Sequence, residues 1–213
     1  MAALYVTKDS GGKTRPAPMT TLEPGQEQSV EALANIAQGL AVNGVGLADL
    51  LSEIAMMERM AAKLSLAASL QTRNADLRET YQGLELEHVA QLAETEQLMK
   101  RAGVDPRYVS PSARVAEVLA QRIGSISLLA GSVDALTMER ATLDAMLLIS
   151  TKCAENRQIL VQIARRIPPS PLRRALRPAT HRLGLASGPA LRRAVTLRRS
   201  LVLGEVLETP EAK

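Results

Sequence analysis

Glu85 and His88 are the two residues whose types and spacing point most directly to metal chemistry. They stand three positions apart, so on an α-helix both side chains project from one side. His88 also shares a stripe with Leu84 and Leu92, which directs it toward the interior of a helical protein. A carboxylate and an imidazole on one helical turn can both bind a transition-metal ion. The spacing therefore predicts two metal ligands on one helix.

A third ligand is expected from the preceding helix. Glu53 lies thirty-two residues before Glu85, a separation that brings it opposite the pair in an antiparallel hairpin. Glu58, little more than one helical turn further on, is the alternative to Glu53. Both glutamates are therefore candidates for the same position.

This arrangement resembles the ferritin-like superfamily of di-iron and di-manganese carboxylate bundles. Such a protein takes a Glu from a first helix and a Glu-x-x-His from the second, repeats this in its second half, and holds two metal ions between the helices. The resemblance covers residues 47 to 106 and includes the Gly103-Val104-Asp105-Pro106 exit. It implies that Glu53, Glu85 and His88 are ligands of iron or manganese.

The second half of the chain departs from the ferritin-like pattern. No His occurs between residues 89 and 180, so a second Glu-x-x-His is absent there. Acidic residues do occur, but none stands in the expected tandem arrangement: Glu117, Asp134, Glu139, Asp144 and Glu155. We therefore expect an incomplete metal site that is not a standard ferroxidase. The alternative is that His88 is a hydrogen-bonded core histidine and no metal binds.

The elements that would position these residues are helices. Phe and Trp are absent, and aliphatic residues supply nearly all of the 46% hydrophobic content, a composition that favours helix over strand. Apolar residues recur at helical spacing in segments 47 to 71, 75 to 102, 112 to 130 and 133 to 167. Short links make successive helices antiparallel neighbours. We predict an all-α, ferritin-like antiparallel four-helix bundle over residues 46 to 167.

The segments on either side of this bundle differ from it in composition. Residues 1 to 28 are rich in Gly, Pro and polar residues and predict an extended or disordered arm. Residues 29 to 44 predict a short helix that Ser29 caps and that Asn43-Gly44 ends. Pro168-Pro169 ends the last bundle helix, so residues 168 to 213 are expected to form a basic tail.

The expected tail concentrates positive charge. Residues 156 to 204 contain eleven Arg and no Asp or Glu, and subtracting +11 from the net +4 leaves −7 for the rest. The positive electrostatic field of this segment attracts phosphates, anionic lipids or an acidic protein, including a neighbouring copy of the chain. Few aromatic residues are available for base stacking, so only non-specific nucleic-acid contact is expected. The candidate anion- or partner-binding residues are Arg173, Arg174, Arg177, Arg192, Arg193, Arg198 and Arg199.

Two functions of different classes are consistent with these features. One is a ferritin-like bundle that binds iron or manganese through an incomplete carboxylate and histidine site. The other is a non-enzymatic structural or interaction subunit that forms a homo-oligomer or docks on a larger assembly, nucleic acid or membrane surface through its Arg-rich tail. The expectation leans against enzymatic activity, and no catalytic residue is assigned.

Other classes of function lack support. The single Cys153 rules out an internal disulfide, and its apolar helical context predicts a small core residue. Neither a Gly-x-x-x-x-Gly-Lys loop nor a Gly-x-Ser-x-Gly turn is present. No uninterrupted apolar run reaches about 18 residues, and no secretory signal is recognisable at the N-terminus. A cytoplasmic protein without a transmembrane segment is therefore expected.

Overall fold

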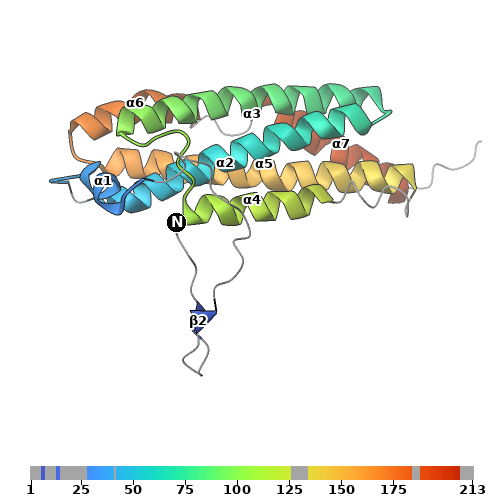
Figure 1. Cartoon of the computed structure of the whole chain (residues 1–213). Helices are drawn as coiled ribbons and strands as arrows, with labels where there is room; N and C mark the ends of the chain where they lie inside the picture. Colours follow the sequence, from blue (N-terminus) through green and yellow to red (C-terminus); the bar gives the residue numbers. More distant parts are fainter. Residues whose placement is uncertain are drawn as a thin grey trace, which may run out of the picture.

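A computed structural model describes residues 6–7, 13–14, 28–40, 42–125, 134–183 and 188–206 (Figure 1). Two short strands, β1 (Val6–Thr7) and β2 (Lys13–Thr14), pair antiparallel within the expected arm, most of which lies outside the described residues. All other elements are helices, which confirms the all-α prediction for this part of the chain. They are α1 (Val30–Asn35), α2 (Gly44–Gln71), α3 (Ala75–Ala102), α4 (Pro111–Gly124), α5 (Ala135–Arg166), α6 (Pro171–Leu183) and α7 (Pro189–Val206).

Capping residues set the ends of α3 and α4. The Asn74 side chain accepts hydrogen bonds from the backbone N–H groups of Asp76 and Leu77, so α3 begins where the sequence predicts. Gly103 ends α3 with a φ of 85°, a left-handed conformation that favours glycine. Ser110 caps α4, and Pro follows it in the first turn. Residues 126 to 130 of the predicted third helix lie outside the described residues.

Gly44 begins a helix, whereas the sequence predicted that Asn43-Gly44 ends one. The Asn43 side chain accepts a hydrogen bond from the backbone N–H of Gly46 at 3.1 Å and so caps α2. A Cβ atom on Gly44 would overlap the carbonyl oxygen of Leu33 in α1. Glycine is therefore required here because α1 packs closely against the start of α2.

The three longest helices share one pattern of core residues. Positions spaced alternately by three and four residues face the interior, as in helices that pack side by side. They are Leu47, Leu51, Ile54, Glu58, Ala61, Ser65 and Ala68 in α2; Leu77, Tyr81, Leu84, His88, Gln91, Thr95, Leu98 and Ala102 in α3; and Leu143, Met146, Ser150, Cys153, Arg157, Leu160 and Ala164 in α5. All are buried except the half-buried Gln91. Polar residues concentrate in the middle of each series.

The apolar core consists of two clusters, one on each side of this polar middle. The first cluster lies at the end that carries α1 and includes Leu51, Met99 and Leu160. The second lies at the opposite end and includes Tyr81 and Met146. Full burial of one large aliphatic side chain contributes about 1.5–3 kcal/mol. The two ends therefore supply most of the hydrophobic stabilisation.

Helices α6 and α7 pack along both α3 and α5, in the region expected to be a basic tail. Leu172 and Leu176 of α6 belong to the first cluster, and Leu191 and Ala194 of α7 belong to the second. Figure 1 shows α6 beside one end of α3 and α7 toward the other end. Both helices thus contribute side chains to the core, which the sequence did not predict.

Helix α4 packs mainly on α2 and touches α5 only briefly. Its buried face is made of alanines, whereas Val115 and Leu119 are exposed. The loop before α4 is tied to α2, because Ser52 Oγ donates a hydrogen bond to the Tyr108 carbonyl oxygen at 2.8 Å. Helix α4 therefore lies alongside α2, while α6 and α7 bridge α3 and α5.

Candidate metal centre

Glu58, His88 and Cys153 meet in the middle of the core, one from each of α2, α3 and α5. One ligand atom from each residue lies within 4.8 Å of the other two. The three residues are 0%, 3% and 0% exposed. Oxygen, nitrogen and sulfur atoms are all metal donors, so this group could hold a metal ion, whose identity the donors alone do not determine.

The Glu58 carboxylate has a partner on each oxygen. Its Oε2 lies 2.6 Å from His88 Nδ1, and its Oε1 accepts a hydrogen bond from Arg157 Nη1. Arg157 is 3% exposed and its guanidinium is always protonated. A buried carboxylate and a buried cation thus neutralise each other, the condition under which charges are tolerated inside a protein.

The remaining polar atoms around this ion pair are also satisfied. His88 Nε2 lies 2.9 Å from Ser150 Oγ, and Arg157 also donates to Gln91 Oε1. Among the described buried side chains, only the Tyr81 hydroxyl lacks a hydrogen-bond partner. We name this connected group the polar layer; its members are Glu58, His88, Gln91, Ser150, Cys153 and Arg157.

Cys153 is a buried free cysteine, in agreement with a small core residue. Burial raises the pKa of its thiol well above the usual value, the Glu58 carboxylate adds to the rise, and Arg157 opposes it. The thiol is therefore protonated at neutral pH. A protonated thiol is a poor nucleophile, so the polar layer does not present an activated cysteine.

Glu53 and Glu85, which the resemblance implied as ligands with His88, lie outside the group of three. Glu53 Oε1 accepts a hydrogen bond from Asn156 at 3.0 Å and lies 3.3 Å from Lys152 Nζ. Glu85 is half-buried and is not a member of the group. Glu58, the alternative, occupies the core series of α2, and this is why it meets His88 whereas Glu53 faces the edge of α5.

Arg157, Ser150 and Gln91 were not among the site residues predicted from the sequence. All three occupy positions of the three-and-four series that faces the core. A polar residue at such a position is buried by the helix register, and it then needs a polar partner. The three-and-four spacing is the feature of the sequence from which their burial could have been predicted.

Two of the arginines expected to bind anions form ion pairs between α7 and acidic residues of α3 and α5. Arg193 Nη2 lies 2.8 Å from Glu79 Oε2 and 3.3 Å from Asp76 Oδ1, and Arg198 Nε donates to Asp144 at 2.5 Å. Hydrogen bonds to these carboxylates raise the pKa of both guanidiniums. The apolar face of α7 meanwhile packs into the core. None of the described helices is long and apolar enough to cross a membrane.

Other basic residues lie at the C-terminal ends of α3 and α5 and at the start of α6. Both α3 and α5 carry two basic residues in the last turn, where a cation interacts favourably with the helix dipole. Arg173 and Arg174 lie in the first turn of α6, where the dipole opposes a cation. We name this cluster the basic end; it comprises Lys100, Arg101, Arg165, Arg166, Arg173 and Arg174. All six are exposed except the half-buried Arg173.

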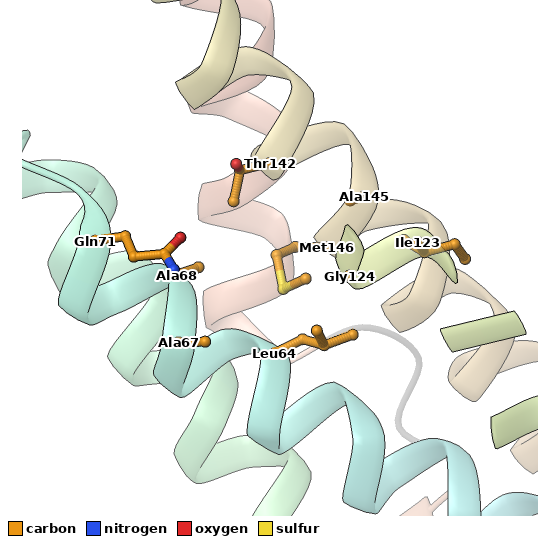
Figure 2. Close-up of a pocket in the computed structure, with 9 residues that line it drawn as sticks. All are labelled: Leu64, Ala67, Ala68, Gln71, Ile123, Gly124, Thr142, Ala145 and Met146. Atoms are coloured by element: carbon orange, nitrogen blue, oxygen red, sulfur yellow. The ribbon is translucent and has the colours of Figure 1, made fainter. Parts of the chain in front are cut away.

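A small hollow lies between α2, α4 and α5 (Figure 2). Its lining includes Leu64, Ile123, Thr142 and Met146, and no acid, base or thiol contributes to it. Acid–base or metal chemistry has no suitable side chain there. The polar layer is therefore the candidate site.

No model of a protein family, no curated protein and no solved structure matches the chain. The ferritin-like resemblance thus rests on the chain's own residues. A di-metal centre of that superfamily takes carboxylates from four helices and a histidine from two of them. The polar layer offers one carboxylate, one imidazole and a guanidinium, so its residues do not fit a di-iron or di-manganese centre.

Proposed function

We propose that this chain is a non-enzymatic structural or interaction protein, with a ferritin-like core whose centre holds an ion pair in place of metal ions. The observation that carries the proposal is the buried pair of Glu58 and Arg157. In this interpretation α2, α3 and α5 are three members of a four-helix bundle. Helices α6 and α7 together take the fourth position.

Electrostatics opposes a metal ion in the natural centre. Two unit charges about 4 Å apart interact by about 4 kcal/mol at an effective dielectric constant of about 20. A divalent ion at that distance from the Arg157 guanidinium would meet a repulsion of about 8 kcal/mol. Relative to the same site without the guanidinium charge, this repulsion taken by itself corresponds to a roughly million-fold loss of affinity. Iron and manganese are therefore expected to bind the natural protein weakly.

Removal of metal should leave the protein unchanged. We expect protein purified without a metal-affinity tag to contain less than about one iron or manganese ion per ten chains by elemental analysis. Its Tm should agree within about 1 °C with and without a chelator, since a ligand that does not bind the native state cannot stabilise it. Stoichiometric metal together with a Tm that falls on chelation would contradict the proposal.

We propose further that the basic end binds an acidic surface of a partner protein. Arg173 and Arg174 lie where the dipole of α6 opposes a positive charge, so helix stability does not explain them. Guanidinium groups bind carboxylates through paired hydrogen bonds. The basic end consists of residues at one end each of α3, α5 and α6, and Phe and Trp are absent from the chain, whereas nucleic-acid sites use extended basic tracks with stacking residues. Local docking on carboxylates is therefore favoured.

Reversing two charges at the basic end tests this docking. The double variant Arg173→Glu, Arg174→Glu should weaken binding of a fluorescent oligoglutamate peptide at least about ten-fold, since four units of charge change at the contact. Fluorescence anisotropy at low and moderate salt measures the affinity. Glutamates in the first turn of α6 suit its dipole, so the fold should persist.

The matched control is Lys63→Glu with Arg122→Glu, which changes the charge equally on exposed residues of α2 and α4. It should bind the peptide nearly as well as the natural protein. An equal loss in both variants would indicate only a net-charge effect and contradict the docking site. Tighter binding of a short DNA duplex or of anionic vesicles than of the peptide would also contradict it.

A further inference from the structure

We propose that Glu58, His88 and Cys153 form a latent zinc or cobalt site that the Arg157 guanidinium keeps closed. The inference rests on the proposed function, in which the natural centre is free of metal. It shares His88 and the alternative Glu58 with the iron or manganese site of the ferritin-like resemblance, and differs from that site in the Cys153 ligand and in the metal selected.

The ligand chemistry selects the metal. Thiolate and imidazole ligands together favour zinc and cobalt, whereas manganese prefers sites made mostly of oxygen donors. On binding, the Cys153 thiol releases its proton to solvent and a metal–sulfur bond forms. The Glu58 carboxylate and the Cys153 thiolate then balance the two positive charges of the ion. No electron transfer is involved.

The geometry needs only a small adjustment. A tetrahedral ion with bonds of about 2.0–2.3 Å separates its ligand atoms by roughly 3.3–3.8 Å. The three donor atoms already lie within 4.8 Å of one another, so side-chain movements of about 1 Å are enough to close the site. The Gln91 Oε1 atom, which accepts from Arg157 in the natural protein, becomes available as a fourth ligand when Arg157 is replaced.

Arg157 closes the site in two ways. Its Nη1 group donates to Glu58 Oε1 and so occupies one of the two carboxylate oxygens that could bind a metal. Its permanent charge repels any cation that enters the same buried space. Replacement by Met keeps much of the aliphatic stem and removes the charge. The Glu58 carboxylate then lacks a cation, which a metal ion can supply.

Cobalt titration of the Arg157→Met variant tests the latent site. We expect about one cobalt ion per chain, with a thiolate-to-cobalt charge-transfer absorption. The affinity should exceed that of the natural protein at least about a hundred-fold, because the opposing charge is gone. Adding Cys153→Ser to the same variant should abolish the absorption. The matched control Arg59→Met, which removes a half-buried arginine paired with Glu96, should not acquire it.

Three results would overturn the inference. A folded Arg157→Met variant without the charge-transfer absorption would exclude the latent site but leave the proposed metal-free function standing. Equal cobalt binding and absorption in the natural protein would contradict both proposals. If Arg157→Met is unfolded without metal, added zinc should restore its helical circular dichroism, since metal binding supplies folding free energy. Failure of zinc to restore it would also exclude the site.

Discussion

Replacement of Arg157 by Ala should lower the free energy of unfolding by about 3–5 kcal/mol, the cost of leaving a buried charge without its partner. Glu58 is fully buried and its other close partner is His88. Without Arg157, the carboxylate loses a charge-assisted hydrogen bond and Gln91 Oε1 loses a donor. Urea denaturation tests this expectation. Far-ultraviolet circular dichroism, which measures helix content, gives the midpoint of the transition.

The control for this variant is Arg59→Ala. Arg59 pairs with Glu96 at 3.0 Å, but both side chains are about one-third exposed. Such a pair is worth about 0–1 kcal/mol, since water screens it. Similar losses in the two variants would show that the Arg157 guanidinium is not a buried charge, and would contradict the polar layer as described.

A triple replacement separates the cost of breaking the pair from its net contribution. Glu58→Leu, His88→Leu and Arg157→Met together remove every buried charge of the polar layer. Replacing a buried ion pair by apolar residues of similar volume is often neutral or stabilising by about 1–4 kcal/mol. We therefore expect the triple variant to be at least as stable as the natural protein, unlike the single variant.

The polar layer constrains how the three longest helices can align. A shift of one heptad between α2 and α5 would place Glu58 opposite Ser150 or Ala164, and Arg157 opposite Leu51 or Ser65. Each charge would then be buried without its partner, at a cost of several kcal/mol. The layer therefore opposes alternative registers, which a purely aliphatic core of similar side chains would allow.

Helix boundaries were predictable where local chemistry determines them. Helix α3 has the bounds expected from the sequence, because Asn74 and Gly103 satisfy the backbone at its ends. The packing of α6 and α7 was not predictable in this way. Their Arg pairs suggested a solvated tail, but Leu172 and Leu176 share one face of α6, Leu191 and Ala194 share one face of α7, and all four are buried. The exposed guanidiniums and the buried aliphatic residues occupy opposite sides of the same helices.

The candidate site was predictable in part for a similar reason. His88 lies on an apolar stripe, so its burial follows from helical periodicity alone. The choice between Glu53 and Glu58 depends on how α2 is rotated against α3, and periodicity of one helix does not determine this. Arg157 was overlooked because Arg is rarely buried without a partner, and the partner, Glu58, lies 99 positions away in the sequence.

Leu176→Ala should lower the free energy of unfolding by about 2–5 kcal/mol, although it lies in the segment that resembles a basic tail. Leu176 is 0% exposed and packs in the first apolar cluster. The matched control is Leu203→Ala in α7, whose side chain is 56% exposed and whose loss should change stability by about 0.5 kcal/mol or less. Urea denaturation of both variants measures the difference.

Deletion of residues 168 to 213 extends the same test. The deletion removes α6 and α7 and so uncovers the apolar surfaces of α3 and α5 that these helices bury. Exposed apolar surface of this extent favours aggregation or loss of fixed packing, so we expect the shortened chain to aggregate or to lose a cooperative thermal transition. A tail that only binds a partner could be removed without these effects. A monomeric shortened chain with an unchanged Tm, together with a stable Leu176→Ala variant, would show that α6 and α7 are not part of the core.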